Sequence, residues 1–245
     1  MTRILIMKAC LTLAGSFVLT LALFFGVSAQ EKRNGRPEVQ PTPKADLAKE
    51  ADRPANDSVH YTYEFNQPNF VVSHVVLEHD SAGRGNVTFV QRTETPIVEP
   101  IQISPAAWTR ILGYWRDLRF LDSDENYQSA KNFAHLGTYK ISMSDGQRRR
   151  TAEYNWSDNK AAWALVNEYR RAADQVIWVF DMKLAREMQP LNAPSLLTEL
   201  ESSLKRNDLS DPQQLVPLLT ELQSDEHIPL IARNQAGRIL KTIKK

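Results

Sequence analysis

The chain has 245 residues, of which 42% are hydrophobic, 9% aromatic and 24% charged. This composition excludes collagen-like, disulfide-scaffold and wholly disordered proteins, and it is typical of a globular protein. Lys and Arg number 30 against 29 Asp and Glu, a formal net charge of +1. Such a balance offers no electrostatic attraction for nucleic acid, so no nucleic-acid partner is expected.

The amino terminus has the pattern of an export signal. Arg3 and Lys8 precede an uncharged stretch, residues 9–27, and small residues at Val27-Ser28-Ala29 suit a signal peptidase. The sequence predicts a signal peptide over residues 1–29 and an exported protein, periplasmic or extracellular. Because the stretch approaches the roughly 20 residues that span a bilayer, an uncleaved anchor remains the alternative and would be the one membrane contact.

The cleaved chain would contain no cysteine, because Cys10 lies inside the predicted signal. Disulfides, cysteine nucleophiles and zinc–cysteine sites are thereby excluded, and no cofactor is predicted. Residues 30–58 contain four prolines and no aromatic residue, so we expect a disordered linker there. The folded part is then predicted to be an α+β domain over residues 59–191 followed by a helical subdomain over residues 192–245.

The first half of the α+β domain is predicted to be mainly strands. Residues 59–65 alternate apolar and polar side chains, as in a half-buried strand. Residues 70–78 and 86–91 predict a hairpin, with positive φ expected at both glycines of the 81–85 connection. Residues 95–100 predict an edge strand, because their prolines cannot donate to a central ladder.

The second half combines two helices with another hairpin. Ser104-Pro105 predicts a helix start, and residues 122–137 predict a long surface loop. Residues 138–144 and 152–156 flank Asp145-Gly146 and predict the second hairpin. The apolar stripe expected on the first helix consists of Trp108, Ile111, Leu112, Trp115 and Leu118.

The longest helix is predicted to run from a cap at Ser157 or Asp158 to about Met188. Its apolar residues near 176–180 surround the helix, so we expect the sheet on one side, at Val176 and Phe180, and the carboxyl-terminal helices on the other. Its predicted inward stripe is Ala162, Leu165, Val166, Tyr169, Ala173, Val176, Phe180 and Leu184.

Three short helices are expected near residues 194–207, 212–223 and 227–244, with Asp225 beginning the last. The leucine stripe of residues 211–243, with Arg233 and Ala236, resembles one HEAT-type repeat. One repeat cannot bury its own apolar face, so we expect it to pack on the long helix.

The order hairpin, helix, loop, hairpin, helix over residues 70–173, with Phe120-Leu121 and Tyr127 between the helix and the second hairpin, resembles uncharacterised secreted bacterial domains of unknown function. The resemblance implies secretion and an α+β fold and implies no activity. The predicted fold class is therefore α+β: an antiparallel sheet of two hairpins plus an edge strand, two packed helices, and a small all-helical carboxyl-terminal subdomain.

Few residues suggest chemistry. His74 and His79 lie five apart in a predicted strand and so point to opposite faces, which prevents a shared metal; no metal site is predicted. The acidic residues 122–126 lack the glycine of a calcium loop and are interpreted as a solvated turn. The familiar motifs of acyl-transfer enzymes and nucleotide binders are absent, so no catalytic residues are predicted.

The candidate partner-binding residues are the basic run Arg148, Arg149 and Arg150 with Tyr127 and His135 of the long loop; Arg170-Arg171 of the long helix suggest a second basic patch. Of the tryptophans, Trp108, Trp115 and Trp156 are assigned to the core, and Trp163 and Trp178 to contacts with the carboxyl-terminal helices or a partner.

We expect a non-enzymatic binding or assembly module of the cell envelope, whose partner is another envelope protein. The alternative is a hydrolase whose acids, or His135 and an acid, meet only in three dimensions. The sequence predicts no oligomeric state.

Overall fold

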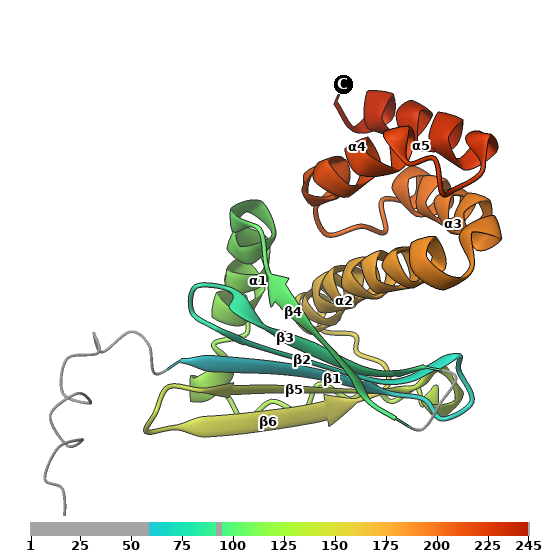
Figure 1. The fold of residues 1–245 in the computed structure, drawn as a ribbon. Helices are drawn as coiled ribbons and strands as arrows, with labels where there is room; N and C mark the ends of the chain where they lie inside the picture. The colour runs from blue at the N-terminus through green and yellow to red at the C-terminus, as the bar shows by residue number, and fades with distance from the viewer. Residues whose placement is uncertain (1–58, 92–94, 245) are drawn as a thin grey trace, which may run out of the picture. The chain divides into compact units, whose positions relative to one another are not determined.

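A computed structural model describes residues 59–91 and 95–244. The predicted export signal, residues 1–29, and the whole predicted linker, residues 30–58, lie outside the described residues. The fold is α+β, as predicted: a six-stranded antiparallel sheet, with helices and a helical carboxyl-terminal part (Figure 1). The strands are β1 (His60–Asn66), β2 (Val72–Asp80), β3 (Arg84–Gln91), β4 (Ile97–Gln102), β5 (Thr138–Ser144) and β6 (Arg149–Tyr154).

The helices are α1 (Pro105–Asp117), α2 (Lys160–Met188), α3 (Ala193–Arg206), α4 (Val216–Ser224) and α5 (Leu230–Ile243). Four short 3-10 turns complete the described chain: η1 (Phe120–Asp122), η2 (Ala134–Leu136), η3 (Pro190–Asn192) and η4 (Pro212–Leu215). Within this part of the chain no helix combines the length and apolar character needed to cross a membrane.

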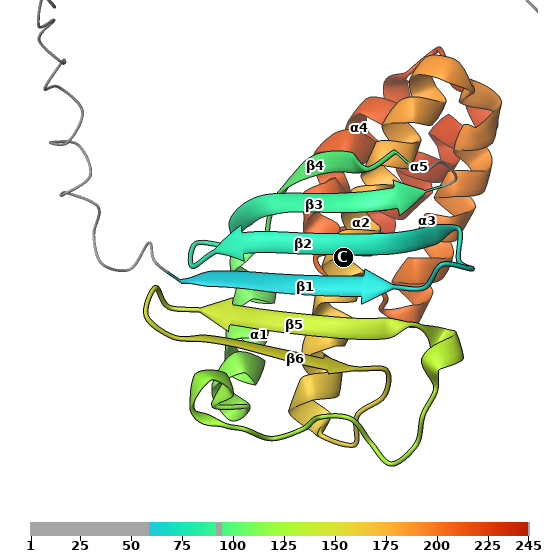
Figure 2. The same cartoon turned by 90° about the horizontal axis from the view of Figure 1, so that it is seen from below.

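The strands lie in the order β4-β3-β2-β1-β5-β6, which Figure 2 shows face on. Strand β4 is an edge strand, as its prolines predicted, and β1 lies between the two hairpins. The β2–β3 connection differs from the prediction: Gly83 has φ +74°, but Gly85 does not have positive φ and lies within β3. Gly85 is required for space, since a Cβ there would overlap the Glu78 carbonyl.

One face of the sheet packs against α1 and α2 and forms the first core. Helix α1 begins as predicted, with the Ser104 hydroxyl accepting a hydrogen bond from the Ala107 amide at 3.2 Å. Of its predicted stripe, Ile111, Trp115 and Leu118 are buried. The aromatic residues Tyr61, Tyr63, Phe89, Tyr139, Tyr154 and Tyr169 fill much of this core.

Helix α2 contributes to two cores. Val176 and Phe180 pack on the sheet core, whereas Trp178 and Val179 pack on a second core formed with the carboxyl-terminal helices. Both assignments were predicted from the sequence. Leu184 was wrongly placed in the inward stripe: it belongs to neither core and is 40% exposed, because its side of the helix faces away from both.

Three further details correct the sequence interpretation. The cap of α2 is Asn159, whose side chain accepts from the Ala161 and Ala162 amides; it is neither Ser157 nor Asp158. Trp163 packs on the sheet core, 4.6 Å from Trp156 between ring centroids, and does not touch the carboxyl-terminal helices.

Asp225 does not begin α5, which starts at Leu230 after Pro229. Its carboxylate instead accepts from the His227 amide at 2.9 Å and pairs with Arg186 of α2 at 2.8 Å. The local turn satisfies this carboxylate better than a helix start would, because Arg186 supplies a charge from another element.

The second core depends on Trp178, which is 8% exposed and donates from Nε1 to the Leu196 carbonyl at 2.8 Å. We predict that Trp178→Ala lowers the free energy of unfolding by about 3 kcal/mol, through the lost burial and the cavity left behind. Urea denaturation measures this. The control is Leu191→Ala, at a position 83% exposed; equal stability of both variants would contradict the packing of α3 to α5 on α2.

Candidate functional site

A hollow of about 680 Å³ opens at the end of the sheet where β1 ends and where β2 and β5 begin. We call it the sheet-end hollow. Its volume lies within the roughly 300–1,000 Å³ typical of small-molecule sites. Its lining comprises Tyr63, Phe65, Val72, Val75 and Tyr139 of the strands, Asn69, Phe70, Val71 and Leu136 of the connections, and Arg170, Ala173 and Asp174 of α2.

The rim of the hollow exposes large apolar side chains. Phe70 is 46% exposed, Val71 65% and Leu136 44%. Single exposed apolar residues are ordinary, but a group around one concavity is typical of a binding surface. The Phe65 ring packs in tilted contacts with Phe70 and Tyr139, at centroid distances of 6.1 and 5.3 Å, so the wall continues from the rim into the sheet core.

The two connections that form the rim are tied together by Gln67, which is 6% exposed. Its Nε2 donates to the His135 carbonyl at 2.6 Å, and its Oε1 accepts from the Asn69 amide at 3.2 Å. Gly137, with φ +105°, lies against the Phe65 ring, and a side chain there would overlap it. These contacts fix the two connections to each other at the rim of the hollow.

Besides the exposed amide side chain of Asn69, four polar side chains line the hollow: the phenols of Tyr63 and Tyr139, and Arg170 and Asp174 on α2. None makes a side-chain hydrogen bond or ion pair with another described residue. Tyr63 is only 1% exposed, yet its hydroxyl is not a fully buried group without a partner, because it has surface at the hollow. Water in the hollow can hydrate this hydroxyl, and a bound ligand can replace that water.

The electrostatics connect these four groups. Burial raises the pKa of Tyr63 well above its ordinary value, Tyr139 and Asp174 raise it further, and Arg170 partly offsets the shift. The phenol is therefore a neutral O–H donor. Burial also raises the pKa of Asp174 to about 6, Arg170 lowers it and Asp208 raises it. The Asp174 side chain is nevertheless exposed, as is that of Arg170, so water solvates both charges where they line the hollow.

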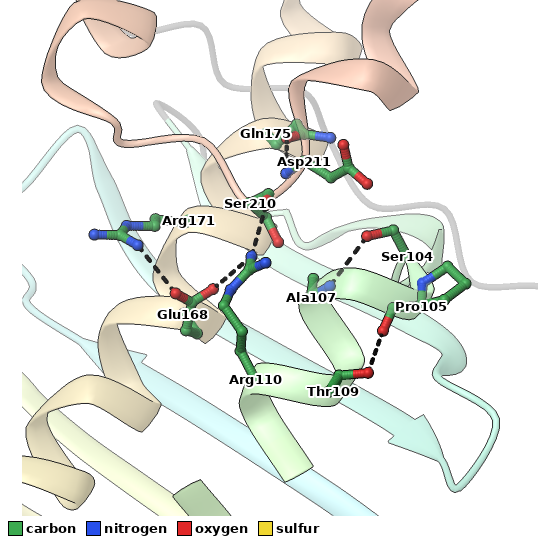
Figure 3. Close-up of polar contacts among 10 residues, drawn as sticks. All are labelled: Ser104, Pro105, Ala107, Thr109, Arg110, Glu168, Arg171, Gln175, Ser210 and Asp211. Atoms are coloured by element: carbon green, nitrogen blue, oxygen red, sulfur yellow. Dashed lines mark hydrogen bonds and ion pairs between the residues drawn. The ribbon is translucent and has the colours of Figure 1, made fainter. Parts of the chain in front are cut away.

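Helix α2 is fixed on its other side by a buried carboxylate, shown in Figure 3. Glu168 accepts from Arg110 of α1 at 3.1 Å and from Arg171 at 3.0 Å, and its side chain is only 6% exposed. Arg110 also donates to the Ser210 carbonyl at 2.8 Å. This network joins α1, α2 and the segment before η4, so it sets the position of α2 beside the hollow.

Next to the Glu168 network, a buried chain of hydrogen bonds joins strand β2 to helices α1 and α2. His79 Nδ1 lies 2.7 Å from the Asp80 carbonyl, which can only accept, so Nδ1 carries the proton. Nε2 then accepts from the Tyr169 hydroxyl at 2.8 Å, and that oxygen accepts from Trp115 Nε1 at 3.0 Å. Every polar atom of the chain has a partner, so this cluster is structural.

The predicted basic run divides among three environments. Arg148 is held at 2.7 Å by both Asp122 and Asp145. Arg150 lies over the ring of Phe120 and donates to the Phe120 and Glu125 carbonyls, at 2.7 and 2.6 Å. Arg149 points to solvent. The structure therefore does not gather the three into one patch, and binding of a partner there stays a prediction.

The other two predicted residues lie apart from each other. Tyr127 is 2% exposed, and its hydroxyl lies 3.0 Å from Arg150 Nη1, so it anchors the 122–137 loop from within. The His135 ring is exposed, whereas its carbonyl is the acceptor for Gln67. His135 thus contributes to the rim of the hollow only through this backbone hydrogen bond.

The histidines lie as the strand pattern predicted. His79 is buried, and His74 on the opposite face pairs with Glu64 at 3.0 Å. Among the described residues no group of His, Cys, Asp and Glu is arranged to hold a metal. The alternation placed the two histidines on opposite faces, but it did not predict that His79 is buried.

The sequence analysis missed three of the four polar residues of the hollow. It placed Arg170 in a basic patch with Arg171, but Arg171 turns to Glu168. The spacing of Arg170 and Asp174 by one helical turn was the sequence signal that could have placed these two residues on the same face of the helix. Tyr63 and Tyr139 are indistinguishable in sequence from core tyrosines, since only the tertiary structure shows which hydroxyls lack a partner.

A scan of the sequence against protein-family models finds no match, and a search of curated proteins finds no significant similarity. The interpretation of the hollow therefore depends on its geometry.

The neutral state of His79 gives a pH-dependent prediction. Burial lowers the pKa of His79 to about 4, whereas an unfolded histidine titrates near 6.5. The unfolded state therefore binds the proton first, so this stabilisation is complete above about pH 6.5 and is lost as the pH falls to about 4. The loss should be about 3 kcal/mol.

We predict that His79→Gln removes this pH dependence, so that the wild type loses about 3 kcal/mol more than the variant between pH 7 and pH 4. Urea denaturation across that range measures the difference. His60→Gln, at an exposed position, is the control and should keep the wild-type slope. Parallel slopes for wild type and His79→Gln would contradict a buried neutral imidazole.

Proposed function

We propose that the protein is an exported, non-enzymatic binding module of the cell envelope and that it holds an apolar ligand in the sheet-end hollow. The observation that carries this proposal is an open apolar concavity whose wall also presents two phenols, a guanidinium and a carboxylate to the hollow. Apolar lining with a few convergent polar groups is the usual composition of a ligand site.

The location follows from the amino terminus. Residues 1–29 have the pattern of an export signal, and residues 30–58 have the composition of a linker. A protein exported in this way would meet its ligand in the periplasm or outside the cell. If the signal is retained as an anchor, the linker would hold the binding domain near the membrane.

Binding fits the hollow better than hydrolysis does. Its lining contains one carboxylate, Asp174, and no histidine, serine or cysteine. Hydrolysis by paired acids needs a second carboxylate, and a nucleophilic route needs a nucleophile beside a base. His135, considered for the hydrolase alternative, contributes only its backbone to the rim.

The test uses N-phenyl-1-naphthylamine, a neutral apolar probe whose fluorescence rises when it leaves water. We predict saturable binding to the purified protein and about tenfold weaker binding to Phe70→Ser, because burial of a phenylalanine is worth about 1.5–3 kcal/mol. Leu136→Ser should weaken binding in the same direction. Both positions are exposed, so neither substitution should impair folding.

Leu191→Ser is the matched control, since Leu191 is exposed and lies on η3, outside the lining of the hollow. It should bind the probe like the wild type. No probe binding, or equal affinity for wild type, Phe70→Ser and Leu136→Ser, would overturn the proposal.

A further inference from the structure

The charged groups of the sheet-end hollow have an arrangement that narrows the chemistry of the ligand. Arg170 and Asp174 lie one turn apart on α2, the spacing at which an Arg–Asp pair ordinarily forms a surface ion pair. They form no ion pair with each other or with another described residue, and both side chains are exposed, so water hydrates them. A cation and an anion are therefore both presented at the hollow, where a ligand can replace that water.

The two tyrosines add hydrogen-bond donors beside the Arg170 guanidinium. The Tyr63 and Tyr139 rings lie 6.3 Å apart between centroids, and both hydroxyls lack a partner among the described residues. Arg170 is electrostatically coupled to both phenols. Two neutral O–H groups and a guanidinium are three donors suited to one anionic group, and charge-assisted hydrogen bonds of this kind are the stronger ones.

Asp174, in contrast, favours a cationic group on the ligand. Its carboxylate, which accepts hydrogen bonds when ionised, is suited to an ammonium group. An anionic ligand would meet Asp174 as a like charge, and a cationic ligand would meet Arg170 in the same way. A ligand with both charges, a few bonds apart, complements the two side chains together, whereas a singly charged ligand meets one of them as a like charge.

Resting on the proposed function above, we propose that the sheet-end hollow binds a single-chain zwitterionic amphiphile. Its anionic group is held by Arg170 and the hydroxyls of Tyr63 and Tyr139, its ammonium by Asp174, and its apolar chain lies along the wall that ends at Phe70. A hollow of about 680 Å³ suits one small molecule of this kind.

The experiment compares three ligands with the same alkyl chain: 2-aminodecanoic acid, which is zwitterionic at neutral pH, decanoate and decylamine. Each is tested below its micelle concentration for displacement of N-phenyl-1-naphthylamine from the purified protein. We expect 2-aminodecanoic acid to bind about tenfold more tightly than either singly charged ligand, because it alone engages both charges.

Two substitutions separate the contributions. Arg170→Gln should weaken 2-aminodecanoic acid and decanoate about tenfold and leave decylamine unchanged or tighter. Asp174→Asn should weaken 2-aminodecanoic acid and decylamine and leave decanoate unchanged or tighter. The matched controls are Arg149→Gln and Asp124→Asn, exposed residues outside the lining of the hollow, and they should leave all three ligands unchanged.

The tyrosines are tested with Tyr63→Phe and Tyr139→Phe, which keep the rings. Each should weaken the two carboxylate ligands and leave decylamine unchanged. Melting temperatures close to that of the wild type would show that the variants fold.

The results separate this proposal from the proposed function. If the probe binds in the hollow but the three ligands bind equally, or the substitutions shift all of them equally, the head-group assignment is wrong while an apolar site remains. Cosedimentation with phosphatidylethanolamine vesicles, without competition by 2-aminodecanoic acid, would overturn the single-chain ligand in favour of a membrane surface. Absence of probe binding would overturn both proposals.

Discussion

The packing of α2 on two sides is the constraint on which the rest of the structure depends. Val176 and Phe180 need the sheet, and Trp178 and Val179 need the carboxyl-terminal helices. A helix with two apolar faces is stable only when both are covered. Both cores therefore share α2, and Glu168 with its two arginines fixes the helix between α1 and the segment that leads to η4 (Figure 3).

The same helix borders two polar clusters of opposite character. In one, Tyr169 completes a chain from His79 to Trp115, and every polar atom has a partner. In the other, Tyr63 and Tyr139 lie beside Arg170 and Asp174, and none of the four makes a side-chain hydrogen bond or ion pair within the described part of the chain. Solvent reaches these groups at the hollow, so they are open to further hydrogen bonds, whereas the first cluster is closed.

Arg148, Arg149 and Arg150, which follow the turn of the second hairpin, are adjacent in sequence but do not form one basic patch. Three basic residues in a row predict a patch only if their side chains share a face, and alternate strand residues point to opposite faces. Arg150 turns inward because Phe120 and Tyr127 offer aromatic faces and the loop offers carbonyls that lack strand partners. Arg150 therefore stabilises the 122–137 loop, which has no strand hydrogen bonds of its own.

The sequence by itself determined the elements whose physics is local: the strand alternation at residues 59–65, the Ser104 cap, the proline-bearing edge strand, and the two apolar sides of α2 at residues 176–180. It did not determine the sheet-end hollow. Strand β1 pairs with both β2 and β5, and this long-range pairing brings Tyr63, Tyr139 and α2 to one place. Whether a tyrosine hydroxyl has a partner depends on residues far away in the chain, so only the tertiary structure decided which core tyrosines hydrogen-bond within the protein and which line the hollow.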